Sequence, residues 1–371
     1  MPRVSELNIL TPLLKPGPKD AITDVPGVSV GHATVIADGA TDEANHGTYR
    51  TGITVIRPHQ DNVYEEPVPA AVHTINGYGK PIGFEQVREL GSIETPIALT
   101  GTLNVPRVAD ALITLAIEQN PHIGIGFARA GWQGYATVNP LVAETNDGFL
   151  SDIQGRPIGE TEVRTALESA TDGSVDEGVV GAGTGTSCFG WKGGIGTASR
   201  VVPARFTIGA LVQTNFGDPH ELTIAGVPVG RHLQPPGRQP KSPGGSIVVV
   251  IATDAPIETH CLGRLLKRAD LALGRTGSAG HTGSGDFVIG FSTGYRAPRR
   301  LPRAGRAGPR LTPSDSLFND LSLAVVESVE EAIYNSLFTA HTVVGRAGNT
   351  RHALPLDETV AIIRARQGCE S

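Results

Sequence analysis

The chain has 371 residues, of which 39% are hydrophobic and 18% charged, and its 31 basic and 37 acidic side chains give a net charge of -6. This length exceeds the ~100–200 residues of an ordinary domain, so it predicts two domains or one large layered α/β domain. The negative charge, without a basic stripe, argues against nucleic acid as a partner. No apolar run reaches the ~18 residues that span a bilayer, so no membrane partner is expected.

The N-terminus and the cysteines bear on the compartment. The first 20 residues hold a short apolar patch and no small-residue cleavage site, so a cytoplasmic location is expected. Cys188, Cys261 and Cys369 form no CxxC pair, which argues against a disulfide framework and a zinc knuckle. Since no cluster of histidines and acids indicates a metal site, we expect neither a metal nor another cofactor.

In the first half of the chain, short β-branched segments bounded by glycine or proline are followed by helical patterns. The sequence predicts strands at Val28–Val35 and Gly52–Arg57 and a helix at Phe84–Leu90. A longer helix is predicted to start at Asn104, a good N-cap, and to stop at Asn120.

The second half continues the pattern. Two strands around a glycine loop are expected in 178–200, and an apolar strand is expected in 206–215. The Pro- and Arg-containing stretch 231–245 predicts an exposed linker. The run 247–252 is continuous rather than alternating, which is typical of a strand buried on both faces.

Beyond this strand, Asp254 is expected to cap a helix that Gly274 ends. A strand is predicted in 286–293 and a long helix in 313–339, and no repeat is visible. The whole order predicts an α/β protein whose helices cover its sheets.

The glycine segment from residue 181 could instead bind a nucleotide. A P-loop needs a lysine after its last glycine, but Trp191 follows Gly190. A dinucleotide fingerprint needs an acid ~20 residues further on, and the stretch 200–209 contains none. The glycines are therefore better explained by tight turns and close strand packing.

The stretch "GGSIVVVIATDAPI" joins the linker directly to the buried strand, with Gly245 and Ser246 at the junction. Such a bond suits self-cleavage, in which the serine hydroxyl attacks the preceding carbonyl and an N-to-O acyl shift precedes hydrolysis. Ser246 would then carry both a nucleophilic hydroxyl and a nearby α-amine that acts as base. Residue types alone leave a plain turn as the alternative.

Spaced motifs in one order carry a specific resemblance over nearly the whole chain. They are "ITDVPGVSVGHATV", "NGYGKPIG", "ELGSIETPIALTGTLNVPRVAD", "ETNDGFLSD", "GAGTGTSCFGWKGGIGTASR", "VQTNFG", "GSGDFVIGFST" and "GRAGNTRHALP", together with the stretch that contains Ser246. In these motifs the chain resembles the self-processing aminopeptidases of peptidase family S58, which include the L-aminopeptidase/D-Ala-esterase and the β-peptidyl aminopeptidases.

The resemblance implies an αββα sandwich that forms a single catalytic domain over residues 1–371. It implies a cut into an α chain, 1–245, and a β chain, 246–371, and a homo-oligomer, a tetramer, of the cleaved units.

The resemblance also implies the roles of the site residues. Ser246 matches the nucleophile, Ser284 and Asp286 match a serine and an acid that assist it, and Asn215 matches a side-chain amide that stabilises the oxyanion. Some β-peptide-cleaving relatives have a glutamate in place of Asp286.

Two further positions concern the substrate. Glu144 matches the acid that holds the substrate's free ammonium group. Asn146 stands where some relatives have an aromatic hydroxyl that faces the oxyanion, a departure that puts the second oxyanion donor in doubt.

The function expected from these residues is an aminopeptidase that removes one residue from small peptides, amides or esters with a free amino group. Two alternatives stay open. One is acyl transfer, as in the ornithine acetyltransferases of related fold, although those enzymes cut before a threonine and this chain has Ser246. The other is a non-catalytic, glycine-rich binding protein. The sequence does not choose among L-α-, D- and β-amino substrates.

Overall fold

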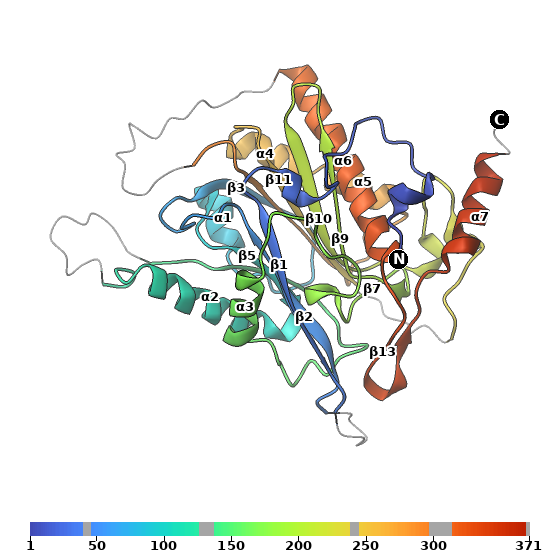
Figure 1. The fold of residues 1–371 in the computed structure, drawn as a ribbon, viewed down its shortest axis with the longest axis horizontal. Coiled ribbons are helices and arrows are strands. Elements are labelled where there is room, and N and C mark those ends of the chain that lie inside the picture. Colours follow the sequence, from blue (N-terminus) through green and yellow to red (C-terminus); the bar gives the residue numbers. More distant parts are fainter. Residues whose placement is uncertain (40–45, 126–136, 238–244, 297–313, 369–371) are drawn as a thin grey trace.

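A computed structural model describes residues 1–39, 46–125, 137–237, 245–296 and 314–368 (Figure 1). In these residues two β-sheets pack face to face. The strand order of the smaller sheet is β1 (Ser29–Ala37), β2 (Tyr49–Arg57), β5 (Ile97–Gly101), β6 (Leu141–Thr145). The order of the larger sheet is β4 (Ser92–Ile93), β3 (Val68–Gly77), β12 (Gly285–Ser292), β11 (Ser246–Thr253), β10 (Thr207–Asn215), β9 (Ile195–Val201).

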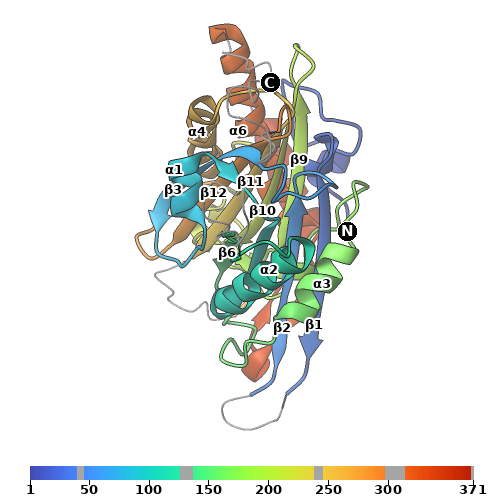
Figure 2. The same cartoon turned by 90° about the vertical axis from the view of Figure 1, so that its left-hand side faces the viewer.

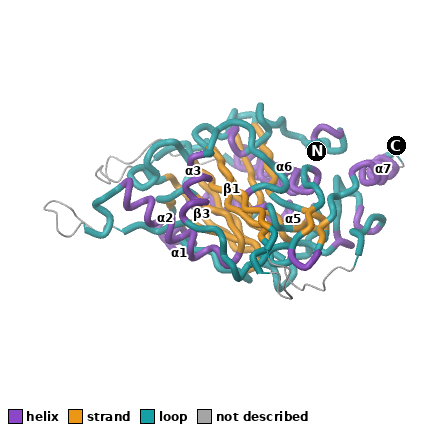
Figure 3. The backbone as a smooth tube through the Cα atoms, turned by 60° about the horizontal axis from the view of Figure 1, so that its bottom comes forward, coloured by secondary structure: helices purple, strands orange, loops and turns teal. Residues whose placement is uncertain are grey.

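Helices cover the outer face of each sheet. α2 (Val105–Gln119) and α3 (Glu160–Glu168) pack on the four-stranded sheet. The six-stranded sheet is covered by α4 (Thr259–Leu266), α5 (Ala269–Arg275) and α6 (Asp315–Phe338) (Figure 2). Figure 3 shows the strands in the interior with helices around them. These layers confirm the predicted αββα sandwich.

Smaller elements lie around these layers. α1 (Phe84–Leu90) contacts β3, and α7 (Leu356–Gln367) packs at the periphery of the molecule. Two short hairpins join β7 (Ser187–Cys188) to β8 (Trp191–Lys192) and β13 (Val343–Val344) to β14 (Thr350–Arg351).

The central strand β11 shows how the sequence builds this architecture. Its eight residues are all buried, which confirms the strand that the continuous apolar run predicts. Because side chains alternate across a strand, Val248 and Val250 enter the core between the two sheets. Ile247 and Val249 enter the core beneath the helices of the outer layer. The strand therefore has no polar face, and its two hydroxyl side chains, Ser246 and Thr253, stand at its two ends.

Two predicted helix caps are wrong in detail. The Asn104 side chain does not cap α2 but accepts a hydrogen bond from the Ile158 amide, at 3.3 Å. The Asp254 side chain accepts a hydrogen bond from Thr207 at the start of β10, at 2.7 Å, so it joins strands instead of capping a helix. The expected single helix is two, α4 and α5, and Gly274 lies inside the second.

The predicted linker is described in part. Residues 245 and 231–237 belong to the described structure, whereas 238–244 lie outside the described residues, as do Pro313 and Cys369.

Candidate active site at the start of the central strand

Ser246, the first residue of β11, lies between two neighbouring strands. It pairs with Asn215, the last residue of the antiparallel β10, and with Gly285, the first residue of the parallel β12. Its side chain is 95% buried, since the residue is only 5% exposed. β6 of the other sheet contacts β11 and ends at Thr145 nearby. Ends of four strands thus bring together residues that are far apart in the sequence.

Two hydrogen-bond donors converge on the Ser246 hydroxyl. The backbone N–H of Asn146 lies 3.3 Å from Oγ, and Nδ2 of Asn215 lies 3.5 Å from it, which is long for a hydrogen bond. Donors this close to a serine hydroxyl can also reach the oxygen of a carbonyl group that the hydroxyl attacks, and negative charge develops on that carbonyl oxygen during acyl transfer. The arrangement suits a serine nucleophile.

The orientation of the Asn215 amide is fixed by its other contacts. Its Oδ1 accepts hydrogen bonds from the backbone N–H and the hydroxyl of Ser187, at 3.0 and 3.2 Å. Its Nδ2 donates to the Asn146 carbonyl oxygen at 2.8 Å. Because Oδ1 is held on the side of Ser187, the NH₂ group faces Asn146 and Ser246.

Asn146 contributes its backbone N–H to the site, and its side chain makes a separate contact. The side-chain Oδ1 accepts a hydrogen bond from the Gly148 amide at 2.9 Å, and the residue is exposed. Its backbone N–H is the group next to Ser246 Oγ. The position that holds an aromatic hydroxyl in some relatives therefore contributes a main-chain donor here.

Ser284 and Asp286 lie on either side of Gly285 and are both buried. The Ser284 hydroxyl donates to Asp286 Oδ1 at 2.6 Å. Burial raises the pKa of Asp286 above its ordinary value, and the Ser284 hydroxyl and the Ile247 amide oppose this rise. A carboxyl with a raised pKa beside a hydroxyl can exchange a proton with it, as general acid–base catalysis requires.

The loop that carries Ser284 is held by Asn76 of β3. Asn76 Nδ2 lies within hydrogen-bond distance of three carbonyl oxygens, those of His281 at 2.9 Å, Thr282 at 3.0 Å and Ser284 at 2.5 Å. The contacts of Asn76 therefore connect β3 to the loop before β12.

Glu144 near the end of β6 is buried, and its carboxylate faces the loop after β3. The Lys80 amide donates to Oε1 at 3.2 Å, and the Lys80 ammonium lies 3.5 Å from the same oxygen. The Lys80 side chain is about half exposed. Glu144 therefore carries a buried charge whose cationic partner is about half exposed.

Gly245 precedes Ser246 in a space that admits no side chain. A Cβ at this position would lie 2.8 Å from Phe216 Cα and 2.9 Å from the Asn215 carbonyl oxygen. The Gly245 carbonyl oxygen accepts a hydrogen bond from the Gly285 amide at 3.0 Å.

Comparison with known proteins identifies the family. The family model described as peptidase family S58 matches residues 20–351. The chain belongs to peptidase family S58. It is 38% identical to the β-peptidyl aminopeptidase BapA of Sphingosinicella xenopeptidilytica, over 95% of this chain and 88% of that protein.

Solved structures of this S58 peptidase's relatives have the same fold. One is the L-aminopeptidase D-Ala-esterase/amidase of Ochrobactrum anthropi, a serine aminopeptidase with a variant of the Ntn-hydrolase fold, at a TM-score of 0.87 and 36% identity over 99% of both chains. Another is a β-aminopeptidase from a Burkholderia species, at a TM-score of 0.84 and 40% identity over 98% of this chain and 99% of that one. The family and these relatives make this protein an enzyme that hydrolyses peptide or amide bonds as an aminopeptidase. Of the three functions that the sequence left open, this is the one the comparisons support.

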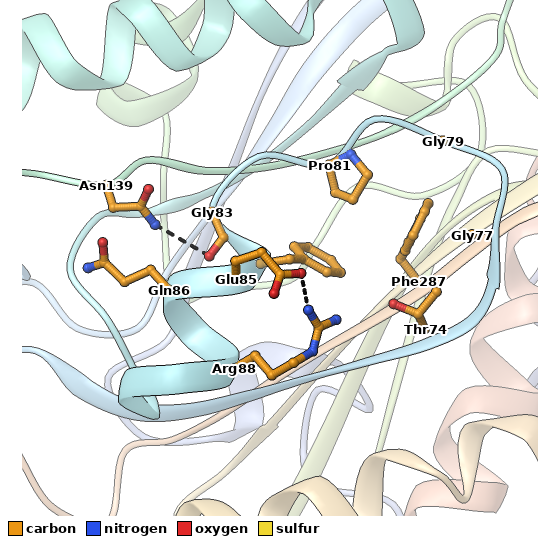
Figure 4. A pocket seen from close by; sticks show the side chains of 11 residues that line it. Thr74, Gly77, Gly79, Pro81, Gly83, Glu85, Gln86, Arg88, Asn139 and Phe287 are labelled. Carbon is orange, nitrogen blue, oxygen red and sulfur yellow. Dashed lines mark hydrogen bonds and ion pairs between the residues drawn. The ribbon is translucent and has the colours of Figure 1, made fainter.

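A cavity of about 350 Å³ lies beside the S58 site (Figure 4). It is bounded by the Phe287 ring, by α1 residues such as Phe84 and Arg88, and by the loop after β3. The same loop contacts Glu144 through Lys80. Ser246 is not among the residues that line the cavity.

Two kinds of feature are missing from the described residues. In the part of the chain that the structure describes, no helix is both long and apolar enough to cross a bilayer. The same residues contain no group of three or more histidine, cysteine or acidic side chains arranged to hold a metal ion.

The structure also adds S58 site residues that the sequence did not single out. The backbone N–H donor of Asn146 cannot be predicted from the type of residue at this position. Ser187 lies in a segment that the sequence predicts only as strands around a glycine loop. Asn76 belongs to the motif "NGYGKPIG", to which the resemblance assigns no role. The last two hold other site residues rather than contacting Ser246 Oγ.

Proposed function

We propose that the protein matures by cutting itself between Gly245 and Ser246, and that the freed Ser246 then acts as an N-terminal nucleophile. The observation that carries this proposal is the convergence of the Asn146 N–H and the Asn215 amide on Ser246 Oγ. The products would be one domain made of two chains, 1–245 and 246–371.

The proposed self-cleavage is an N-to-O acyl shift. Ser246 Oγ attacks the Gly245 carbonyl carbon, the C–N bond breaks as the nitrogen takes a proton, and water hydrolyses the resulting ester. Negative charge develops on the Gly245 oxygen, to which the Gly285 amide already donates. The absence of a side chain at Gly245 keeps this carbonyl close to β10.

In the proposed catalytic cycle, Ser246 Oγ attacks the substrate carbonyl while its new α-amine accepts the proton. Asn215 and the Asn146 amide stabilise the oxyanion, and the leaving amine departs with a proton. Water then releases the acyl-enzyme. Ser284 and Asp286 form the hydrogen-bonded pair that assists proton transfer next to β11.

The proposed substrate is a small peptide, amide or ester with a free amino group. Its ammonium would take the place of the Lys80 ammonium at the Glu144 carboxylate. By likeness to the β-peptidyl aminopeptidases, substrates with an N-terminal β-amino residue are included. A homo-oligomer, a tetramer, of cleaved units is a further part of the proposal and rests on the family resemblance alone. The cytoplasmic location stays an expectation from the sequence.

The test compares p-nitroanilides of alanine and β-alanine, each with a free and an acetylated amine. We expect the parent enzyme to hydrolyse the free-amine compounds and Ser246→Ala to hydrolyse none. Equal rates for acetylated and free substrates would contradict the proposed recognition of the ammonium.

A further inference from the structure

Lys192 on β8 is a buried cation that the proposed mechanism does not use. The residue has no exposed surface, and its Nζ donates to three backbone carbonyl oxygens: Gly183 at 2.9 Å, Thr186 at 2.8 Å and Gly193 at 2.7 Å. It forms no ion pair with a residue that the structure describes. A buried charge is costly unless it is fully hydrogen-bonded. The Lys192 ammonium therefore needs these three carbonyl oxygens around it.

The three acceptors match the three N–H groups of an ammonium. Burial lowers the pKa of Lys192 to about 7; the nearby Arg351 guanidinium also lowers this pKa, and the Asp147 carboxylate opposes the fall. A neutral amine could donate to only two of the three carbonyls. A methionine of similar length would remove the Lys192 donor from all three, although the Gly183 oxygen also accepts a hydrogen bond from the Thr186 hydroxyl at 3.1 Å.

Two of the carbonyls, those of Gly183 and Thr186, belong to the turn 183–187. The last residue of this turn, Ser187, contacts the proposed oxyanion donor Asn215. Thr186 immediately precedes Ser187, whose N–H and hydroxyl both donate to Asn215 Oδ1. The turn has no free space on its other side, because a Cβ on Gly185 would lie 1.9 Å from the Arg50 carbonyl oxygen and 2.9 Å from Asp147 Cβ. The ammonium and this close packing together define where Ser187 lies.

We propose that Lys192 is a positioning residue for oxyanion stabilisation. It holds the turn 183–187 so that Ser187 keeps the Asn215 amide aimed at Ser246. The inference rests on the proposed role of Asn215. It predicts that Lys192 affects turnover through Asn215 and not through the general stability of the fold.

A double-mutant cycle tests this inference on the full-length protein. The values of kcat and KM are measured on the self-cleaved fraction of each variant. The variants are Lys192→Met, Asn215→Ala and the double variant. Trp191→Phe is the control, because Trp191 is buried on the same short hairpin and its ring nitrogen has no hydrogen-bond partner among the residues that the structure describes.

We expect Lys192→Met to lower kcat by roughly tenfold or more, part of the ~10²–10³-fold loss typical when a whole oxyanion donor is removed. KM should stay within about twofold. In the Asn215→Ala background the same substitution should change kcat by less than about threefold, since residues that act through one another are not additive. Trp191→Phe should leave kcat near that of the parent.

Equal losses in both backgrounds would overturn the inference and leave the proposed function standing. If Asn215→Ala turns over substrate like the parent, the role of Asn215 fails and the inference fails with it. Should Lys192→Met not fold, Lys192→Gln, which can donate two of the three bonds, carries the same cycle. If neither variant folds, Lys192 is required for folding, and the positioning role is overturned.

Discussion

The side-chain amide of Asn215 and the hydroxyl of Ser246 face each other across the pairing of β10 with β11, with Nδ2 3.5 Å from Oγ. Both residues stand at the ends of their strands. The sheet register therefore sets the distance between the proposed nucleophile and its oxyanion donor. The Asn146 N–H, which comes from the other sheet, completes the arrangement at 3.3 Å.

Replacing Asn215 with alanine removes one of the two oxyanion donors. We expect kcat to fall by roughly 10²–10³-fold with a small change in KM, because the contact strengthens only as charge develops on the oxygen. Asn215→Asp, which keeps the shape but cannot donate, should lose as much. Steady-state kinetics on the cleaved fraction measures both, and a variant that retains full kcat would exclude Asn215 from the reaction.

Ser284→Ala removes the hydrogen bond beside Ser246, and Asp286→Asn keeps an acceptor oxygen there but removes the carboxyl group that can exchange a proton. Loss of a positioned proton-transfer group costs roughly 10²–10⁴-fold, so we expect a fall in kcat of that order and little change in KM. Ser292→Ala is the control, because Ser292 is a buried serine at the far end of the same strand. Equal turnover in Ser284→Ala, Asp286→Asn and this control would remove the pair from the site.

Glu144→Gln keeps the size of the side chain and removes its charge. A charge-assisted hydrogen bond contributes about 1.5–3 kcal/mol, so kcat/KM for free-amine substrates should fall by roughly 10–100-fold. Lys80→Met breaks the same ion pair but keeps the carboxylate, and it should not raise KM. The opposite pattern, a loss with Lys80→Met alone, would assign the substrate contact to the lysine.

Gly245→Ala tests the requirement for close approach at the cut bond. The added Cβ would lie 2.8 Å from Phe216 Cα, so the scissile carbonyl has to move and self-cleavage should slow markedly. Gly274→Ala is the control, because a Cβ there would lie within 4 Å of no atom from another part of the described structure. A time course on denaturing gels shows whether the two variants differ, and identical cleavage rates would argue against the geometric requirement.

Asp147 makes the stability of the fold depend on pH. Burial raises its pKa from 3.8 to about 6 in the folded chain. Between these values the folded state binds more protons at this site than the unfolded state, so the free energy of unfolding falls as pH rises. The loss should be about 2–3 kcal/mol relative to Asp147→Asn. Chemical denaturation of the Ser246→Ala chain with and without Asp147→Asn, at pH 4 and pH 7, measures it. A difference between the two chains that does not change with pH would contradict this assignment.

The elements that the sequence predicts best are those in which apolar residues are continuous or recur at a regular period. The apolar run after Ser246 is β11, and the periodic segment after Asn104 is α2. The roles of Asp254 and Asn104 were predicted wrongly because a capping side chain is local in sequence, whereas these two bond to segments 47 and 54 residues away.

In the candidate site, too, some residues could be predicted from the sequence and others could not. Ser246, Ser284, Asp286, Asn215 and Glu144 were assigned by resemblance to a family, and the structure places them near the ends of strands that meet. The Asn146 main-chain donor was missed because every residue type except proline carries a backbone N–H. The contacts of Lys192 were missed because its acceptors are carbonyl oxygens, which no sequence pattern marks.

Release of Ser246 as an N-terminus is the central claim, and the mass of the purified protein tests it most directly. Intact-mass analysis and N-terminal sequencing should find two chains in the parent, the smaller beginning at Ser246, and a single chain in Ser246→Ala. A parent protein that remains one chain of 371 residues while hydrolysing free-amine substrates at full rate would contradict the account.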